Sequence, residues 1–75
     1  MSKRESKREK VHPKYCFLKA YQDTAGFSDK QMADMLDMSE RAYADKLRGW
    51  SDFSLPQGQF LSELFDASQD QIFLT

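Results

Sequence analysis

The organisation of this chain is decided by residues 28–49, which read SDKQMADMLDMSERAYADKLRG. Ser28 and Gln31 have the spacing of a capping box, in which the serine accepts a hydrogen bond from the Gln31 amide and the glutamine side chain reaches back. Phe27 precedes them as a candidate hydrophobic staple. Apolar residues then recur over two turns, and this pattern predicts a helix at about 29–36.

A second helix is expected after only three residues. Asp37 tolerates the left-handed conformation that a sharp turn needs, and Ser39 is a suitable N-cap. Apolar residues continue at helical spacing until Gly49, so the sequence predicts a helix at about 40–48. On this helix Tyr43 is expected to face the core.

The flanking segments predict three further helices. Pro13 suits a first helical turn and Gly26 a helix end, which predicts a helix at about 14–25 with Phe17, Leu18 and Tyr21 at helical spacing. Two more capping boxes begin at Ser54 and Ser68 and predict a helix to about residue 66 and a short final helix. Gly58 should weaken the first of these by about 1 kcal/mol relative to Ala. The predicted fold class is all-α, a compact five-helix bundle.

Length and charge divide the chain into two parts. Seventy-five residues suffice for one small domain. Residues 1–19 carry seven cations and two anions, whereas residues 20–75 carry four cations and ten anions. Residues 1–12 are too polar to form a core, so we expect a basic flexible arm at 1–12 and a domain at 13–75.

Composition also excludes several classes of protein. There is no 18-residue apolar run for a transmembrane helix, and the charged start is not a secretory signal. A single cysteine, Cys16, excludes an internal disulfide or a zinc finger and favours a reduced, cytoplasmic setting. No nucleophile and base set, phosphate loop or metal-spaced cluster is found. We therefore expect no enzymatic activity, cofactor, metal or small-molecule ligand.

Two short helices joined by a three-residue turn, with the small Ala33 on the first, are the arrangement of a helix-turn-helix. The turn sets the helices at a steep angle, so that the second projects from the bundle. An α-helix fits the major groove of DNA, where the base edges present a distinguishable pattern.

At this point residues 28–49 resemble the phage-repressor and Cro-like helix-turn-helix family (XRE type). The resemblance includes Leu18, Lys19, Tyr21, Gly26 and Phe27 before this stretch. The branch found in phage-type regulators is resembled at the end of this stretch, in segment 46–49, and beyond it in segments 51–55, 64–66 and 70–73. The resemblance implies a five-helix, lambda-repressor-like domain that binds a palindromic operator as a dimer and controls transcription, as a repressor or in lysis–lysogeny control.

The chain departs from that family at several positions. It has Asp29 where the family usually has a phosphate-reaching Gln, and Asp37 where Gly is usual in the turn. The second helix carries Glu40, Ala44 and Asp45, and residues 28–48 have a net charge of −1. Acidic side chains can accept from cytosine, and a basic arm can supply phosphate contacts. Alternatively, the same fold serves as a protein-interaction module, such as an antirepressor or a regulator partner.

The candidate site residues fall into three sets. Those expected to face the bases of double-stranded DNA are Ser39, Glu40, Arg41, Ala44 and Asp45. Those expected to meet phosphates are Lys30, Gln31, Arg48 and Ser51, together with Lys3, Arg4, Lys7, Arg8 and Lys10 of the arm. The third set is apolar and exceeds what two short terminal helices can hide, so part of it should close the bundle and the remainder is the candidate homodimer contact: Phe60, Phe65, Ile72, Phe73 and Leu74. Bound to DNA, the protein would be associated with the nucleoid.

Single residues complete the expectations. Cys16 is interpreted as a buried or half-buried inert thiol, and His12 as a solvated histidine of the arm. Met32, Met35 and Met38 are interpreted as core filling, with an adaptable partner surface as the alternative. Trp50 either packs under the following helix or lies beside the DNA-facing edge.

Overall fold

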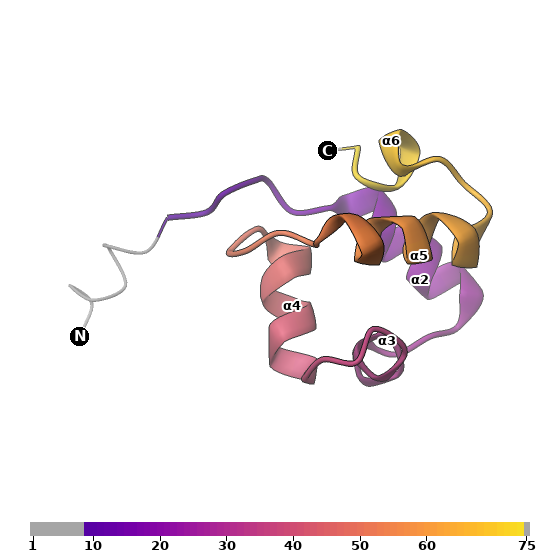
Figure 1. Ribbon diagram of the computed structural model, residues 1–75, viewed down its shortest axis with the longest axis horizontal. Helices are drawn as coiled ribbons and strands as arrows, with labels where there is room; N and C mark the ends of the chain where they lie inside the picture. Colours follow the sequence, from indigo (N-terminus) through magenta and orange to yellow (C-terminus); the bar gives the residue numbers. More distant parts are fainter. Residues whose placement is uncertain (1–8, 75) are drawn as a thin grey trace.

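The computed structural model describes residues 9–74, and over that range it consists of α-helices without a strand (Figure 1). The helices are α2 (Cys16–Ala25), α3 (Asp29–Met35), α4 (Glu40–Arg48), α5 (Leu55–Phe65) and α6 (Gln69–Ile72). The predicted all-α, five-helix bundle is confirmed. The arm residues Lys3, Arg4, Lys7 and Arg8 lie outside the described residues.

The predicted helix starts are formed by serine caps. The side chains of Ser28, Ser54 and Ser68 each accept a hydrogen bond from the backbone amide three residues on. In return, the backbone amide of each serine donates to the side-chain Oε1 of the glutamine at that position. Ser39 caps α4 through the Ala42 amide at 3.1 Å. These bonds satisfy backbone groups that a helix leaves unpaired, so local sequence fixes where four of the helices begin.

The turns between helices use left-handed residues where the sequence predicts them. Gly26 and Gly49 end α2 and α4 with φ of 81° and 106°. Asp37, with φ of 58°, makes the turn between α3 and α4. Asp66 ends α5 in the same left-handed conformation, at a position where no glycine marks the helix end.

The start of the domain differs from the prediction. α2 begins at Cys16 rather than at residue 14, so Pro13 lies before the helix and not in its first turn. The preceding backbone bonds to the end of α4, where the Val11 amide donates to the Gly49 carbonyl at 2.7 Å and the Tyr15 amide to the Leu47 carbonyl at 3.0 Å. Residues 11–15, here called the strap, therefore belong to the folded domain, and the boundary placed after residue 12 is too late.

One core joins the helices. Leu18, Met32, Tyr43, Leu61 and Ile72 are fully buried and come from α2, α3, α4, α5 and α6 respectively. Gly58 is buried where α6 packs on α5, and a Cβ there would lie 2.9 Å from Gln69 Oε1 and 3.3 Å from the Phe73 ring. Its lack of a side chain admits α6, which offsets the expected weakening of α5. Among the described helices, none has the length and apolar character needed to cross a membrane.

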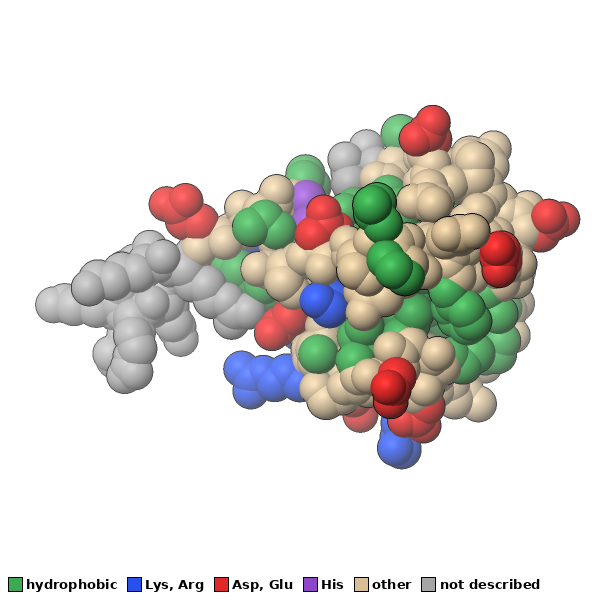
Figure 2. Space-filling model, in the orientation of Figure 1, with side chains coloured by type: hydrophobic (Ala, Val, Ile, Leu, Met, Phe, Trp, Pro, Cys, Tyr) green, Lys and Arg blue, Asp and Glu red, His purple; other side chains and the backbone are tan. Residues whose placement is uncertain are grey.

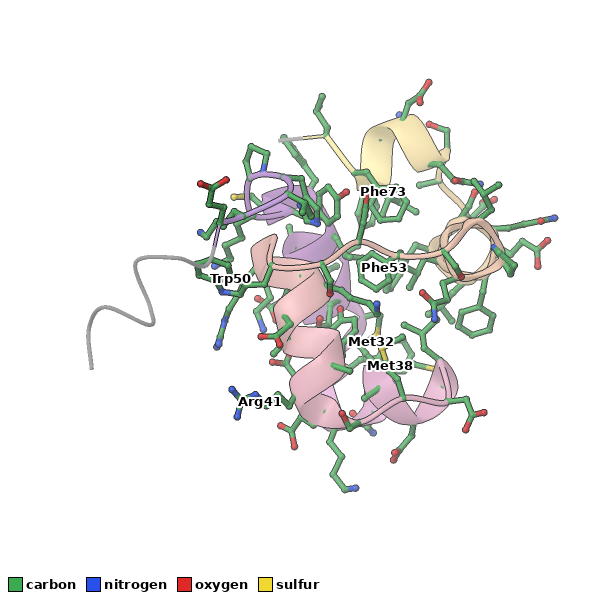
Figure 3. All side chains as sticks on the ribbon, turned by 60° about the vertical axis from the view of Figure 1, so that its left-hand side comes forward. Met32, Met38, Arg41, Trp50, Phe53 and Phe73 are labelled. Atoms are coloured by element: carbon green, nitrogen blue, oxygen red, sulfur yellow. The ribbon has the colours of Figure 1, made fainter. Side chains whose placement is uncertain are left out.

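The methionines are divided between core and surface. Met32 is fully buried and Met38 packs against the core, as expected. In Figure 3 both lie in the space between α3, α4 and α5. Met35 is 37% exposed, so the interpretation of it as core filling is wrong.

Candidate nucleic-acid interface

α3 and α4 form a corner at one end of the bundle. α3 is seen end-on in Figure 1 while α4 stands upright beside it, so the two helices cross at a steep angle. Leu36 ends α3, its amide bonding to the Met32 and Ala33 carbonyls, and the Met38 amide bonds to the Ala33 carbonyl at 3.0 Å. These bonds close the turn and fix the direction in which α4 leaves it.

The outward side of α4 is polar and accessible. Ser39, Glu40, Arg41 and Arg48 are exposed, and Ala44 and Asp45 are half-buried. In Figure 3 Arg41 extends from α4 away from the bundle. The inward side carries the buried Tyr43 and Leu47. The structure therefore gathers the predicted base-facing residues on one side of one helix, with two of them partly covered.

A buried polar network holds α4 against α2 and α3. The Tyr43 hydroxyl donates to Gln22 Oε1 at 2.6 Å, and Gln22 Nε2 donates to Asp29 Oδ1 at 2.6 Å and to the Phe27 carbonyl at 3.2 Å. Gln22 is completely buried, and its amide group is hydrogen-bonded at both ends. The bonds stabilise one relative placement of three helices, because any other placement leaves buried polar atoms unpaired.

Charges converge on Asp29 at the start of α3. The hydrogen bond from Gln22 lowers the pKa of this carboxyl, and the positive charges of Lys19 and Arg48 lower it further. Lys19 Nζ lies 3.4 Å from Asp29 Oδ1 and 3.4 Å from Asp23 Oδ1. Asp29 is thus a structural anion inside the corner. Its hydrogen bond with Gln22 and its ion pair with Lys19 explain why an acidic residue is accommodated at the start of α3.

The burial of Tyr43 has an electrostatic consequence. Desolvation, followed by the negative charges of Asp29 and Asp23, holds the pKa of its hydroxyl well above the usual range. The hydroxyl of Tyr43 is therefore protonated at neutral pH and donates its hydrogen bond to Gln22.

A second cluster fastens the strap to the segment after α4. His12 Nδ1 lies 2.7 Å from the Pro13 carbonyl oxygen, and His12 Nε2 lies 2.8 Å from that of Ser51. The His12 ring stacks on Tyr15 at 3.9 Å between centroids. His12 is therefore packed, and its interpretation as a solvated histidine is wrong.

Asp52 completes this cluster. Its Oδ1 accepts from the Tyr15 hydroxyl and from the Phe53 amide, both at 2.8 Å. Burial and the bond to Asp52 raise the pKa of Tyr15. The Ser51–Phe53 segment thereby anchors the strap beside the end of α4.

The described phosphate candidates differ in availability. Lys30 is exposed and lies 3.9 Å from Asp34, and Arg48 is exposed. Gln31 Oε1 is engaged by the capping bond from the Ser28 amide, which leaves its Nε2 as the group that can donate. Ser51 is half-buried, with its carbonyl bonded to His12. Lys10 is exposed, and its Nζ lies 5.4 Å from the centroid of the half-buried Trp50 ring.

The candidate dimer residues are largely internal. Ile72 is fully buried. The centroid of the Phe73 ring lies 4.8 Å from that of Tyr15 and 5.7 Å from that of Phe53. Phe65 stacks near Tyr21 at 5.7 Å. The prediction of Ile72 as a dimer contact is wrong, because α6 folds back and places this side chain in the core. Phe65 at the end of α5 and Phe73 after α6 are half-buried and pack against the core. Phe60 is half-buried, and Leu74 is 54% exposed.

Cys16 also differs from its interpretation. Tyr15 and Leu18 take the inward positions at the start of α2, so the helical turn directs Cys16 and Phe17 outward. The thiol is exposed rather than buried.

One face of the molecule carries an apolar patch. Figure 2 shows hydrophobic side chains gathered between α5 and α3, with acidic side chains around them. Leu55 at the start of α5 is 84% exposed.

Sequence reasoning missed Gln22, His12, Tyr15 and Asp52 as organising residues. For Gln22 a signal was present, since it follows the buried Leu18 by four residues on the inward side of a helix. The pairing of His12 with Ser51 has no local signal.

Within residues 9–74 no group of three metal-binding side chains is found. In comparisons with known proteins, no family model matched the chain, and no curated protein or solved structure matched it significantly.

Proposed function

We propose that the protein is a sequence-specific DNA-binding regulator of transcription that inserts α4 into the major groove as a helix-turn-helix. The observation that carries the proposal is the polar outward side of α4. On the inward side of this helix Tyr43 bonds to Gln22 of α2, and the turn after α3 sets the direction of α4. A helix with its inward side locked and its outward side accessible has the geometry that major-groove reading requires. The proposal includes a dimer on a two-fold symmetric operator.

The chemistry of the surface gives each residue a role. Arg41 can donate two hydrogen bonds to guanine, while Glu40 and Asp45 can accept from cytosine amino groups. Lys30, Arg48 and Lys10 lie around this surface as candidate phosphate contacts. The basic residues before Glu9 add positive charge that the acidic domain lacks.

The test compares the DNA affinities of two variants, one at a residue proposed to contact bases and one at a residue proposed to contact a phosphate. Arg41→Ala should reduce affinity by about 5- to 150-fold and relax the preference at one base position. Lys30→Ala, matched as an exposed cation of the same corner, should weaken all duplexes alike and reduce the salt dependence. Both variants change side chains outside the core and should fold normally. The assigned reading face is wrong if Arg41→Ala keeps the parent's sequence preference.

A second candidate is a protein-interaction module, which the apolar patch of Figure 2 and the exposed Leu55 favour. Exposed apolar surface framed by charge is typical of protein contacts. Salt separates the two functions. Binding to DNA should weaken steeply between about 50 and 200 mM salt, whereas binding through an apolar patch should hardly change.

A further inference from the structure

The His12 ring lies between two backbone carbonyl groups, and both of its nitrogens face an acceptor. Nδ1 is 2.7 Å from the Pro13 carbonyl oxygen, and Nε2 is 2.8 Å from that of Ser51. A carbonyl oxygen has no proton to donate, so each contact is a hydrogen bond only if the ring nitrogen carries the proton. A neutral imidazole has one N–H group, whereas the imidazolium ion has two. The arrangement therefore fits the charged ring and not the neutral one.

Burial makes the neutral ring unfavourable in this position. Only 10% of the His12 side-chain surface is exposed, so water has little access to either nitrogen. With a neutral ring, one nitrogen would direct its lone pair at a carbonyl oxygen, and that carbonyl would lose its donor without gaining another. The ring would have to leave its place for both groups to be hydrated.

The charged groups around the ring also favour a positive charge. Asp52 Oδ1 lies 3.7 Å from Nε2, and the ring stacks on Tyr15 with 3.9 Å between centroids, which attracts a cation to the aromatic face. Tyr15 itself stays neutral, because burial and its bond to Asp52 raise the pKa of its hydroxyl. The cations on the neighbouring segments oppose the charge less strongly. Lys10 and Lys14 are exposed to solvent, and Lys46 Nζ donates to the Asp52 carbonyl at 3.1 Å.

His12 connects the strap to the segment that follows α4. We propose that His12 is a proton-dependent latch: the strap is fastened while both ring nitrogens carry a proton, and it detaches when one proton is lost as the pH rises. His12 is the only histidine of the chain, and histidine is the side chain that ordinarily changes charge between about pH 5 and 8. The serine caps and the bond between Tyr43 and Gln22 contain no such group, so the response is confined to the strap.

The latch fixes the place where the basic start of the chain joins the domain. The Val11 amide bonds to the Gly49 carbonyl, so Lys10 and the cations that precede it in sequence start from the end of α4. A fastened strap would keep these cations beside the phosphates of a duplex bound by α4, and DNA affinity should decrease as the strap detaches. This consequence rests on the proposed function, whereas the latch itself does not depend on DNA.

Trp50 can report the state of the strap in the full chain without DNA. It is the only tryptophan, it is half-buried, and Lys10 Nζ lies 5.4 Å from the centroid of its ring. Its fluorescence should move to longer wavelength as the pH rises from about 5 to about 8, because detachment of the strap uncovers the ring. Helical circular dichroism should stay constant over the same range, which separates detachment from unfolding.

Amide hydrogen exchange locates the change along the chain. The protection of the Val11 amide, corrected for the intrinsic exchange rate at each pH, should fall about tenfold or more between about pH 5 and 8. The Met38 amide is the internal control, because it bonds to the Ala33 carbonyl at 3.0 Å in the turn between α3 and α4. Its protection should not change.

Two substitutions separate the latch from a general effect of pH. His12→Gln keeps a hydrogen-bond donor but gains no charge, so its Trp50 emission and Val11 protection should be the same at both ends of the range and should resemble those of the parent at high pH. Gln59→His adds a histidine at an exposed position of α5 and is the matched control. It should respond like the parent, and in the His12→Gln chain it should not restore the response.

Three results would overturn the proposal. The first is a parent chain whose Trp50 emission and Val11 protection do not change between about pH 5 and 8. The second is a His12→Gln variant that keeps the response of the parent, and the third is a response restored by Gln59→His in that variant. A pH-dependent strap combined with pH-independent DNA affinity would contradict the role of the basic residues in DNA binding and would leave the latch intact.

Discussion

Two glycines that end helices provide a matched test of the strap. Gly26 and Gly49 both have positive φ, of 81° and 106°. A Cβ added at Gly26 would meet nothing within 4 Å, whereas one at Gly49 would overlap the carbonyl oxygen of His12. Alanine at either site should cost about 1–2 kcal/mol from the left-handed backbone. Replacing glycine by alanine also lowers the conformational entropy of the unfolded chain, which raises stability by the same amount in both variants. This effect therefore cancels when the two variants are compared.

The overlap at Gly49 adds a cost that Gly26 does not have. To avoid the overlap, His12 must move away from Gly49. This movement lengthens two hydrogen bonds: the one from the Val11 amide to the Gly49 carbonyl oxygen, at 2.7 Å, and the one between His12 Nε2 and the Ser51 carbonyl oxygen, at 2.8 Å. At about 1 kcal/mol for each bond, Gly49→Ala should cost about 2 kcal/mol more than Gly26→Ala.

Urea unfolding of the full chain, followed by helical circular dichroism, measures both free energies of unfolding. Equal losses in the two variants would refute the reasoning, because they would show that the strap does not pack against the end of α4. A larger loss for Gly26→Ala would contradict it as strongly.

Two further predictions concern the buried network. Tyr43→Phe leaves the buried Gln22 Oε1 without its donor and should lower the free energy of unfolding by about 1–3 kcal/mol in the same assay. Tyr21→Phe is the control, because it removes the hydroxyl of a half-buried tyrosine of α2 that is not the donor to Gln22. Equal losses in the two variants would exclude a specific role for the Tyr43 hydroxyl. Asp29 has a lowered pKa in the folded state, so its stabilising contribution is fully present above about pH 4 and is lost as the pH falls through the folded-state value. Asp29→Asn should therefore have a lower free energy of unfolding at neutral pH than the parent, and this free energy should decrease less between about pH 4 and pH 2. If the free energies of unfolding of the variant and the parent fall in parallel over this range, Asp29 is not the stabilising anion.

The elements of the fold could be predicted because their signals are local. Ser28, Ser54 and Ser68 each lie three residues before a glutamine, and Gly26 and Gly49 mark left-handed helix ends. Each of these signals acts within one or two turns of chain. The helix bounds they predict agree with the structure to within a residue or two. The prediction that Pro13 lies in a first helical turn is wrong, because the neighbouring residues Val11 and Tyr15 bond to the distant end of α4.

The long-range contacts could not be predicted in the same way. Tyr43 meets Gln22 across 21 residues, and His12 meets Ser51 across 39. Apolar content likewise does not distinguish core from interface, which is why Ile72 was assigned to a dimer contact although it is buried. The outward residues of α4 were predictable, because helical periodicity divides its two sides once Tyr43 and Leu47 are placed inside.

Selection from a randomised duplex library at about 100 mM salt tests the central claim most directly, with the full chain and Arg41→Ala run in parallel. The account predicts that the full chain enriches a motif with two-fold symmetry and that Arg41→Ala loses the preference at one position of each half-site. If the folded full chain enriches no sequence, α4 is not a DNA-reading helix, and its acidic outward side is a surface for protein.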